Sequence, residues 1–268
     1  MSTELVLLVS DLFIPLRIPD IDIQFKSILV PNKIQHVICL GNVGNQETYD
    51  WLHGLSSNFH SIQGDYDINR NLPEKKAIQV GNFRIGMIHG HQIIPLGDLE
   101  ILANVQRELD CDILVSGYTH QLSVNIKENK LYINPGSLSG ALSPLVEDCI
   151  PSFILMALQG EEATIYSYVL SDKTKKFEVG QMEYFRGSNE LKIVKEIAGE
   201  NNKNENNNNN ENENNINNEN DNEEKNILEK EENAEQQELI QENNPSSEVQ
   251  NQTEEVKEAE NNDEKMDE

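Results

Sequence analysis

Basic residues are scarce in this chain of 268 residues, which has 21 Lys and Arg against 47 Asp and Glu and a formal net charge of −26 at pH 7. A nucleic-acid partner would need clustered Lys and Arg side chains to contact its phosphates. The acidic balance therefore argues against nucleic acid as a partner. Long apolar runs are also missing, because the N-terminal run Leu5–Val9 is too short for a membrane span or a secretory leader. We therefore expect membrane contact only indirectly, through partner proteins.

Cysteine is rare as well, and the three cysteines, Cys39, Cys111 and Cys149, lie far apart without any CxxC spacing. Such a set is typical neither of a disulfide framework nor of a zinc-binding motif. An odd count, together with the lack of a secretory leader, favours reduced thiols. The cysteines thus predict a cytoplasmic protein.

Aromatic residues are absent after residue 198, where the composition also changes. Residues 199–268 are mostly Asn, Glu and Gln, with 23 acidic and 5 basic side chains, whereas residues 1–198 have 24 acidic and 16 basic ones. Low hydrophobicity with high net charge cannot offset the entropy lost on ordering. We therefore predict one domain over residues 1–190, followed by a disordered Asn/Glu-rich acidic tail over residues 199–268.

Short apolar runs alternate with helix-like segments in the first half of the domain. Each run ends at a small or polar residue, which is typical of buried strands that lead into loops. The expected strands are Leu5–Val9, His36–Leu40, Phe59–Gln63, Phe83–Ile88 and Ile113–Val115. The expected helices are about Gln46–Leu55 and Asp98–Leu109, the second with Asp98 as its N-cap.

The second half of the domain lacks helical patterns. Glu128 and Asn129 form a two-residue turn between two strand-like segments, which predicts a hairpin. The expected strands are Ser123–Lys127, Lys130–Asn134, Ser152–Leu158, Ala163–Val169 and Phe177–Tyr184. Together the two halves predict an α/β (α+β) fold, with sheets packed on each other and helices outside.

Five of the strand ends carry a polar side chain: Asp11, Asn42, Asp65, His89 and His120. A single Asp or His in such a place usually caps a turn or makes an ordinary hydrogen bond. The repetition along successive strands is what suggests a metal centre, because carboxylates and imidazoles are common ligands of divalent ions.

The loops that hold these residues read Asp11–Phe13, Gly41–Asn42, Gly64–Asp67, His89 and Gly117–His120. In this order they resemble the metal-site loops of the calcineurin-like metallophosphoesterase superfamily, which read D-x-H, G-D, G-N-H-D, H and G-H-x-H. The resemblance implies a metallophosphoesterase-like, four-layer αββα sandwich.

A closer resemblance within that superfamily runs from about Leu5 to Tyr184. Its segments are Val30–His36, Gly64–Asp67, Ile88–Gln92, Tyr132–Ser137 and Ile150–Phe153. They are similar to the retromer small-subunit family, whose members belong to an endosomal cargo-sorting coat. The resemblance implies a scaffold in retrograde endosome-to-Golgi transport, cytoplasmic and peripheral on endosome membranes through the complex.

Four positions depart from the superfamily's metal-site pattern: Phe13, Asn42, Tyr66 and Tyr118 stand where active members have histidines or a bridging carboxylate. Phe cannot bind a metal, and Asn offers a neutral oxygen where two dications need negative charge. We therefore predict no catalytic residues and no required cofactor. The alternative function is a divalent-metal-dependent phosphoesterase.

The four residues that match the pattern, with Asn42 as a weak fifth, are predicted to form a vestigial metal site that holds at most one weakly bound divalent ion, Zn or Mn. The residues of this site are Asp11, Asn42, Asp65, His89 and His120. A purely hydrogen-bonded polar cluster is the alternative interpretation.

The retromer resemblance also implies two binding surfaces. The first, around the vestigial site, would bind the large α-solenoid subunit, vacuolar protein sorting-associated protein 35, through Phe13, Ile94, Pro95 and Leu96. The alternative is that these residues pack inside the domain. The second surface, which would bind regulators of the complex, consists of Leu5, Ile28, Leu155, Tyr166, Tyr168 and Val179. Other retromer subunits are also implied as partners.

Overall fold

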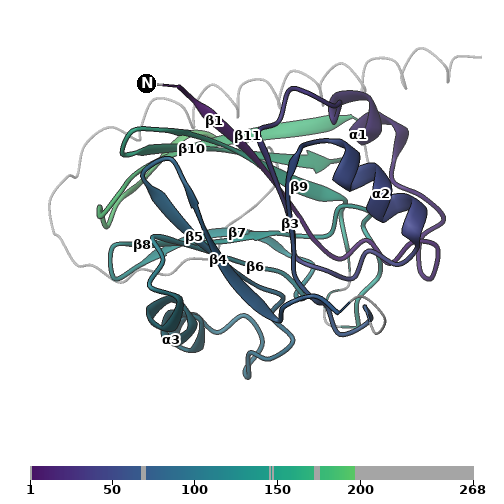
Figure 1. The fold of residues 1–268 in the computed structure, drawn as a ribbon, viewed down its shortest axis with the longest axis horizontal. Helices are drawn as coiled ribbons and strands as arrows, with labels where there is room; N and C mark the ends of the chain where they lie inside the picture. The colour runs from purple at the N-terminus through teal and green to yellow at the C-terminus, as the bar shows by residue number, and fades with distance from the viewer. Residues whose placement is uncertain (1, 68–70, 145, 147, 172–175, 197–268) are drawn as a thin grey trace, which may run out of the picture. The chain divides into compact units, whose positions relative to one another are not determined.

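The computed structural model describes residues 2–67, 71–144, 146, 148–171 and 176–196. These residues form a mixed α/β sandwich of two sheets and three helices (Figure 1). The predicted acidic tail, residues 199–268, lies outside the described residues.

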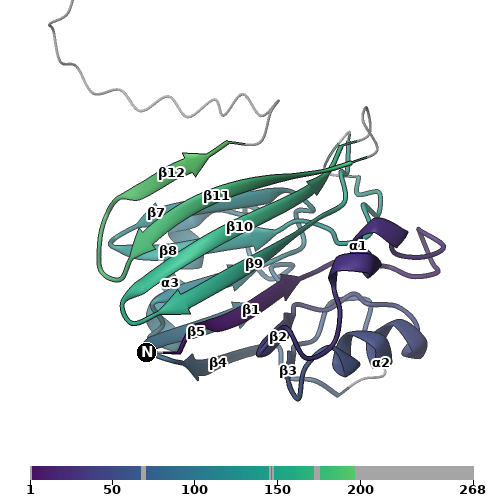
Figure 2. The ribbon, with the colours of Figure 1, turned by 90° about the horizontal axis from the view of Figure 1, so that it is seen from above.

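The first sheet has seven strands in the order β12-β11-β10-β9-β1-β2-β3 (Figure 2). Its strands are β1 (Glu4–Val9), β2 (His36–Cys39), β3 (Asn58–Ser61), β9 (Ser152–Gln159), β10 (Glu162–Leu170), β11 (Phe177–Phe185) and β12 (Leu191–Lys195). The neighbours β1, β2 and β3 are parallel, so their carboxyl ends meet at one edge of the sheet. The strands from β9 to β12 pair antiparallel.

The second sheet has five strands in the order β4-β5-β6-β8-β7. Its strands are β4 (Lys75–Val80), β5 (Phe83–Ile88), β6 (Ile113–Ser116), β7 (Leu122–Lys127) and β8 (Lys130–Pro135). The neighbours β5, β6 and β8 are parallel, whereas β4 and β7 add antiparallel edges. The parallel strands, at one end of the first sheet and in the middle of the second, lead into the loops where the polar residues lie.

The helices form the two outer layers. Helices α1 (Ile23–Ile28) and α2 (Gln46–Gly54) pack on the first sheet, where Phe25 and Leu52 are buried. Helix α3 (Leu99–Leu109) packs on the second sheet. The largest core lies between the two sheets. These layers confirm the predicted four-layer sandwich.

Local signals in the sequence place several element ends correctly. The carboxylate of Asp98 accepts hydrogen bonds from the backbone N–H groups of Glu100 and Ile101, both at 2.9 Å, as an N-cap does. Glu128 and Asn129 have φ values of 52° and 57°, which matches the two-residue turn predicted between β7 and β8.

Three elements were missed by the sequence analysis: α1, β4 and β12. Strand β4 contains three polar residues and lies at an edge, so it lacks the continuous apolar run by which buried strands are recognised. Strand β12 is also an edge strand, and it pairs with β11 beyond the domain end expected at residue 190. Among the described residues, no helix is both long and apolar enough to cross a membrane.

Candidate functional site

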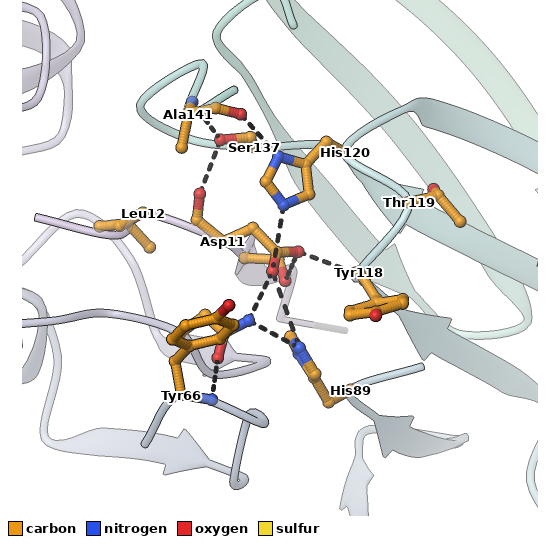
Figure 3. A network of polar contacts seen from close by, with 12 residues as sticks. Asp11, Leu12, Tyr66, His89, Tyr118, Thr119, His120, Ser137 and Ala141 are labelled. Atoms are coloured by element: carbon orange, nitrogen blue, oxygen red, sulfur yellow. Dashed lines mark hydrogen bonds and ion pairs between the residues drawn. The ribbon is translucent and has the colours of Figure 1, made fainter. Parts of the chain in front are cut away.

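Loops at the strand ends bring the five predicted polar residues together. Three of them, Asp11, His89 and His120, are labelled in Figure 3. Asp11 follows β1, Asn42 follows β2, and Asp65 follows β3. His89 follows β5 and His120 follows β6, so the site lies where the two sheets meet. The contacts described below join these five residues into one cluster.

The backbone around the site is held in an uncommon conformation. Asp11, Phe13, Asn42, Tyr118 and His120 all have left-handed φ values, between 50° and 71°. Such values are unfavourable for residues with a Cβ and persist where surrounding contacts enforce them. Strain of this kind gathers at functional sites, so the cluster supports a functional origin for these loops.

Asp11 is fully buried and accepts several hydrogen bonds. Its Oδ2 accepts from the Ser10 hydroxyl at 2.6 Å and from the backbone N–H of Tyr118 at 2.8 Å. Its Oδ1 lies 3.6 Å from Nε2 of His120 and 3.7 Å from Nε2 of His89. Burial disfavours the charged carboxylate, but the two histidines and the Ser10 hydroxyl outweigh it and lower the pKa of Asp11.

The side chain of Asn42 occupies the middle of the site. Its Oδ1 accepts a hydrogen bond from the backbone N–H of Tyr66 at 3.0 Å, which fixes the orientation of the amide. Its Nδ2 therefore points at the other side: Oδ1 of Asp11 is 3.1 Å away, Oδ1 of Asp65 is 2.8 Å away, and Nε2 of His89 is 2.9 Å away. An NH₂ group thus lies among groups that could bind a cation.

His89 and His120 are oriented in the same manner. In each, Nδ1 is bonded to a backbone carbonyl at 2.7 Å, that of Leu40 for His89 and that of Ala141 for His120. A carbonyl can only accept, so Nδ1 carries the proton and Nε2 faces the site. This arrangement is common in histidines that bind a metal through Nε2.

The charges of the site favour a carboxylate–imidazolium pair when no cation is bound. Burial opposes both charges, but hydrogen bonds from His89 and Asn42 bring the pKa of Asp65 down to about 2. Burial likewise opposes the charge on His89, but Asp65 and Asp11 raise the pKa of its imidazole. When protonated, Nε2 of His89 donates to Asp65 Oδ1 at 3.3 Å. When the imidazole is neutral, Nε2 of His89 instead accepts a hydrogen bond from the NH₂ group of Asn42.

The residues that depart from the superfamily pattern surround this cluster. The Phe13 ring lies 5.1 Å from the Tyr66 ring and 5.6 Å from the His120 ring, centroid to centroid. The guanidinium of Arg17 lies 3.7 Å above the Phe13 ring. The ring of Tyr118 lies 5.6 Å from that of His89. Aromatic packing thus fills space next to the polar cluster.

The donor set of the predicted site does not fit a metal ion as it stands, because the Asn42 NH₂ group points into its centre and donates hydrogen bonds there. A second set fits better. Asp65, His89 and His91 each offer a ligand atom within 4.8 Å of the other two. This triad would hold a single divalent ion, which would supply positive charge and Lewis acidity when bound.

His91 and Asp67 were missed by the sequence analysis. His91 lies one residue beyond Gly90, in an H-G-H sequence that repeats the ligand type at a spacing of two. Asp67 is buried, and its Oδ2 accepts from the backbone N–H groups of Asn42 at 2.6 Å and Gly64 at 3.0 Å. It therefore ties the β2 and β3 loops together, a role that a sequence pattern does not reveal.

The expected contact residues around the site are only partly exposed. The Ile94 side chain is 78% exposed and that of Leu96 is 41% exposed, and Pro95 is exposed as well. Phe13, however, is buried at 3% exposure beneath Arg17. The expectation that Phe13 itself offers contact surface therefore has to be corrected: it supports its exposed neighbour Tyr66 instead.

The six residues of the expected second surface are all half-buried. In the register, Leu155 pairs with Tyr166, and Tyr168 pairs with Val179. Tyr166 and Tyr168 alternate with Ile165, which belongs to the core between the sheets, so the tyrosines face the outer side of the first sheet. Among the described residues, Figure 2 shows no helix over β10 and β11 on this side.

Comparisons with known proteins agree with this geometry. The sequence model of the calcineurin-like phosphoesterase superfamily domain matches residues 5–160. Vacuolar protein sorting-associated protein 29 (Vps29) of Schizosaccharomyces pombe is 35% identical over 184 residues, which are 67% of this chain and 97% of that protein. The chain belongs to the Vps29 family. Both resemblances noted in the sequence, to the calcineurin-like metallophosphoesterase superfamily and to the retromer small-subunit family, are thereby confirmed.

Solved Vps29 structures have the same fold. Vps29 of Cryptosporidium parvum is 41% identical, with a TM-score of 0.66 over 68% of this chain and 98% of that one. Vps29 of Entamoeba histolytica, complexed with Zn²⁺, is 43% identical, with a TM-score of 0.63 over 67% of this chain and 98% of that one. The matches leave the remaining third of this chain uncovered.

Proposed function

We propose that this Vps29-family chain is a non-catalytic scaffold subunit of retromer that serves vacuolar protein sorting and retrograde endosome-to-Golgi transport. It binds the large α-solenoid subunit, vacuolar protein sorting-associated protein 35, through the surface around the polar site. Family membership supports the role in protein sorting. The protein acts in the cytoplasm and reaches endosome membranes through the assembled complex.

The observation that carries this proposal is a set of exposed apolar side chains on the loops that also hold the polar site. Ile94 is 78% exposed, Leu16 68%, Leu142 66% and Tyr66 53%. Arg17 joins members of this set, because its guanidinium donates to the carbonyl of Leu142 and lies near the Tyr66 ring. Apolar patches of this kind on a protein surface commonly mark protein–protein interfaces.

The loop that carries Ile94 is anchored at both ends. Ile93 is buried, and its backbone N–H donates to the carbonyl of Gly90 at 3.1 Å. The backbone N–H of Asp98 donates to the carbonyl of Pro95 at 3.2 Å. An anchored loop presents Ile94 and Leu96 with little loss of conformational entropy on binding. Full burial of one such side chain contributes about 1.5–3 kcal/mol.

The groups that line the site support the proposed lack of catalysis. Two-metal hydrolysis needs anionic charge between the metals, and Asn42 supplies a hydrogen-bond donor there instead. Phe13 has no ligand atom, and Tyr66 is exposed where an active relative has a histidine. We expect the chain to hydrolyse model phosphomonoesters and phosphodiesters no faster than background with Mn²⁺, Zn²⁺ or Mg²⁺. Turnover that disappears in Asp11→Ala would instead support the phosphoesterase alternative.

The second surface is proposed to bind regulators of the complex. Leu155, Tyr166 and Tyr168 lie on the outer face of the first sheet, and tyrosines that are half-buried can anchor a partner segment. Leu5, Ile28 and Val179 complete this surface.

The docking surface is tested by Ile94→Asp, with Ile23→Asp as a matched control. Ile23 is 75% exposed, on α1, so the two variants introduce the same charge at nearly the same exposure. A charge at the centre of an apolar interface weakens binding by several kcal/mol, or roughly a hundredfold or more. We expect Ile94→Asp to lose affinity for the large subunit to this extent and Ile23→Asp to keep it. A folded Ile94→Asp variant that binds normally would refute the proposed surface.

A further inference from the structure

We propose that a pocket between helix α3 and strand β4 binds an arginine side chain of a partner protein, with Glu74 as the group that receives its charge. The pocket has a volume of about 300 Å³. None of the residues predicted from the sequence to form the polar site or the two binding surfaces lines it. The inference goes beyond the proposed docking function and does not depend on it.

The walls of the pocket come from two elements of the second layer pair. Ile101, Val105 and Glu108 line it from α3, and because they lie three or four residues apart they share one side of the helix. Glu74 and Lys75 line it where the chain enters β4. Among the described residues, β4 is the last strand of its sheet, so no further strand covers this side of the pocket.

The inner surface of the pocket is apolar. Ile88 and Ile93 line it and are almost fully buried in the cluster beneath α3. Ile101 and Val105 pack against the same cluster but are only half-buried, so they still offer apolar surface. Covering this surface with an aliphatic chain is favourable. Ligand pockets have volumes of roughly 300–1,000 Å³, so this one is small and suits a single long side chain better than a large cofactor.

The charges at the opening of the pocket favour a cation. Nζ of Lys75 donates to Oε1 of Glu108, so these two charges compensate each other. Glu74 is exposed, and no hydrogen bond or salt bridge to its carboxylate is found among the described residues. The pocket therefore has one uncompensated negative charge, in a chain whose net charge is −26. Both charges repel an anionic ligand and attract a cationic one.

Arginine combines the two properties that the pocket requires. Its three-carbon stem can lie on apolar surface while the charged end stays at the opening. Its planar guanidinium donates two parallel N–H groups to one carboxylate, and it is more weakly hydrated than the ammonium of lysine. An arginine stem on Ile101 and Val105 would thus leave its guanidinium at the level of Glu74.

The position of the pocket favours a protein segment over a free amino acid. Gln92 and Ile93 line the pocket, and the next residue, Ile94, is 78% exposed. A segment whose arginine enters the pocket can therefore place a neighbouring apolar side chain on Ile94. This step uses only the exposure of Ile94 and not its proposed contact with the large subunit. The expected ligand is a segment with arginine next to an apolar residue.

The test is an NMR titration of the ¹⁵N-labelled full chain with the peptide acetyl-Leu-Arg-Leu-amide. The matched ligand is the same peptide with citrulline in place of arginine, because citrulline keeps the shape of the side chain and lacks the charge. Glu74→Gln removes the charge of the pocket. Glu190→Gln is the matched control, since Glu190 is also exposed but precedes β12 of the first sheet.

We expect saturable shifts of the amide signals of Lys75, Gln92 and Ile101–Glu108, with a dissociation constant of roughly 1 mM for a ligand of so few atoms. Glu74→Gln and the citrulline peptide should each weaken binding by about threefold or more, as loss of a partly exposed ion pair does. Glu190→Gln should leave the affinity of the arginine peptide unchanged.

Equal affinity for the arginine and citrulline peptides would overturn the proposal, and so would unchanged affinity in Glu74→Gln. Shifts confined to residues outside the pocket, or no saturation by about 20 mM peptide, would overturn it as well. The amide spectrum of each variant checks its fold. Because the acidic residues after position 198 are the same in all proteins compared, weak binding of the peptide to them cancels.

Discussion

At the residue scale, the amide of Asn42 takes the place that a cation would have in an intact metal centre, because its NH₂ group contacts the residues that would be metal ligands. It donates hydrogen bonds to the carboxylates of Asp11, which is buried, and Asp65, which is exposed, and so holds the loops after β1, β2 and β3 together. The presence of all five polar residues in one cluster was predictable from the strand-end pattern. The direction of the amide was not, because it depends on the backbone N–H of Tyr66, which only the folded loop brings within reach.

Asn42→Asp is predicted to make the fold dependent on metal. The substitution replaces a donor by a third carboxylate between Asp11 and Asp65 and leaves buried charges without compensation, which destabilises a protein by several kcal/mol. We expect the melting temperature of the variant in EDTA to fall by several degrees and to recover when Mn²⁺ or Zn²⁺ is added. The unaltered chain should melt at nearly the same temperature in both conditions. A variant that melts like the unaltered chain in EDTA would show that the amide has no such role.

Asp112 is predicted to make stability depend on pH. Burial would raise the pKa of this carboxyl, but the backbone N–H of Arg84 and the ammonium of Lys130, each 3.0 Å away, lower it below the ordinary value of 3.8. A depressed pKa stabilises the fold at pH values above about 4, and this contribution is lost as the pH falls through the folded-state pKa.

We therefore expect Asp112→Asn to be less stable than the unaltered chain at pH 7, by about 1.5–3 kcal/mol for hydrogen bonds to a charged group. The difference should shrink as the pH falls from about 4 towards 2. Urea unfolding of both proteins at several pH values measures this difference in the free energy of unfolding. A difference that stays constant over this range would contradict the role of the charge.

At the scale of elements, most strands and the two longer helices were predictable, whereas the short helix α1 and the edge strands β4 and β12 were not. Strand β5 and the cap of α3 agree with the sequence patterns because continuous apolar runs and an N-cap Asp are local signals. Strands β4 and β12 carry polar residues at the sheet edges, and their pairing partners lie elsewhere in the chain. Their formation depends on tertiary contacts that a short window of sequence does not contain.

The N-cap of α3 is predicted to contribute measurably to stability. Asp98→Ala removes the acceptor of two backbone N–H groups and should lower the free energy of unfolding by about 1 kcal/mol. Asp98→Asn keeps an acceptor oxygen and should change stability by only a few tenths of a kcal/mol. Urea unfolding of the two variants measures both values. Equal stability of the Ala and Asn variants would show that the cap contributes nothing.

At the scale of the whole molecule, the sequence divides into a domain and an acidic C-terminal segment, and we propose that the domain folds without that segment. A chain of residues 1–198 should melt within about one degree of the full chain, because the removed residues contain no aromatic side chain. A chain of residues 1–190 also lacks β12, which pairs with β11, and should be less stable than the 1–198 chain. A fall of several degrees already in the 1–198 chain would show that the acidic segment packs on the domain.

For the whole molecule, too, some features of the function were predictable from the sequence and others required the structure. The order of the loop motifs was sufficient to predict the family and the sandwich. Ile94 is exposed, as its expected contact role requires, whereas the burial of Phe13 was not predicted, since it is also an apolar residue in a polar loop motif. Phe13 packs under the guanidinium of Arg17 and against the rings of Tyr66 and His120, contacts that form only in the folded chain.

The proposed scaffold function is tested most directly by isothermal titration of the full chain with the purified large α-solenoid subunit in EDTA. The account predicts saturable one-to-one binding with a dissociation constant below about 1 μM, or ~8 kcal/mol of binding free energy, without any metal. Absence of binding at concentrations of about 100 μM, in a chain shown to be folded, would contradict it.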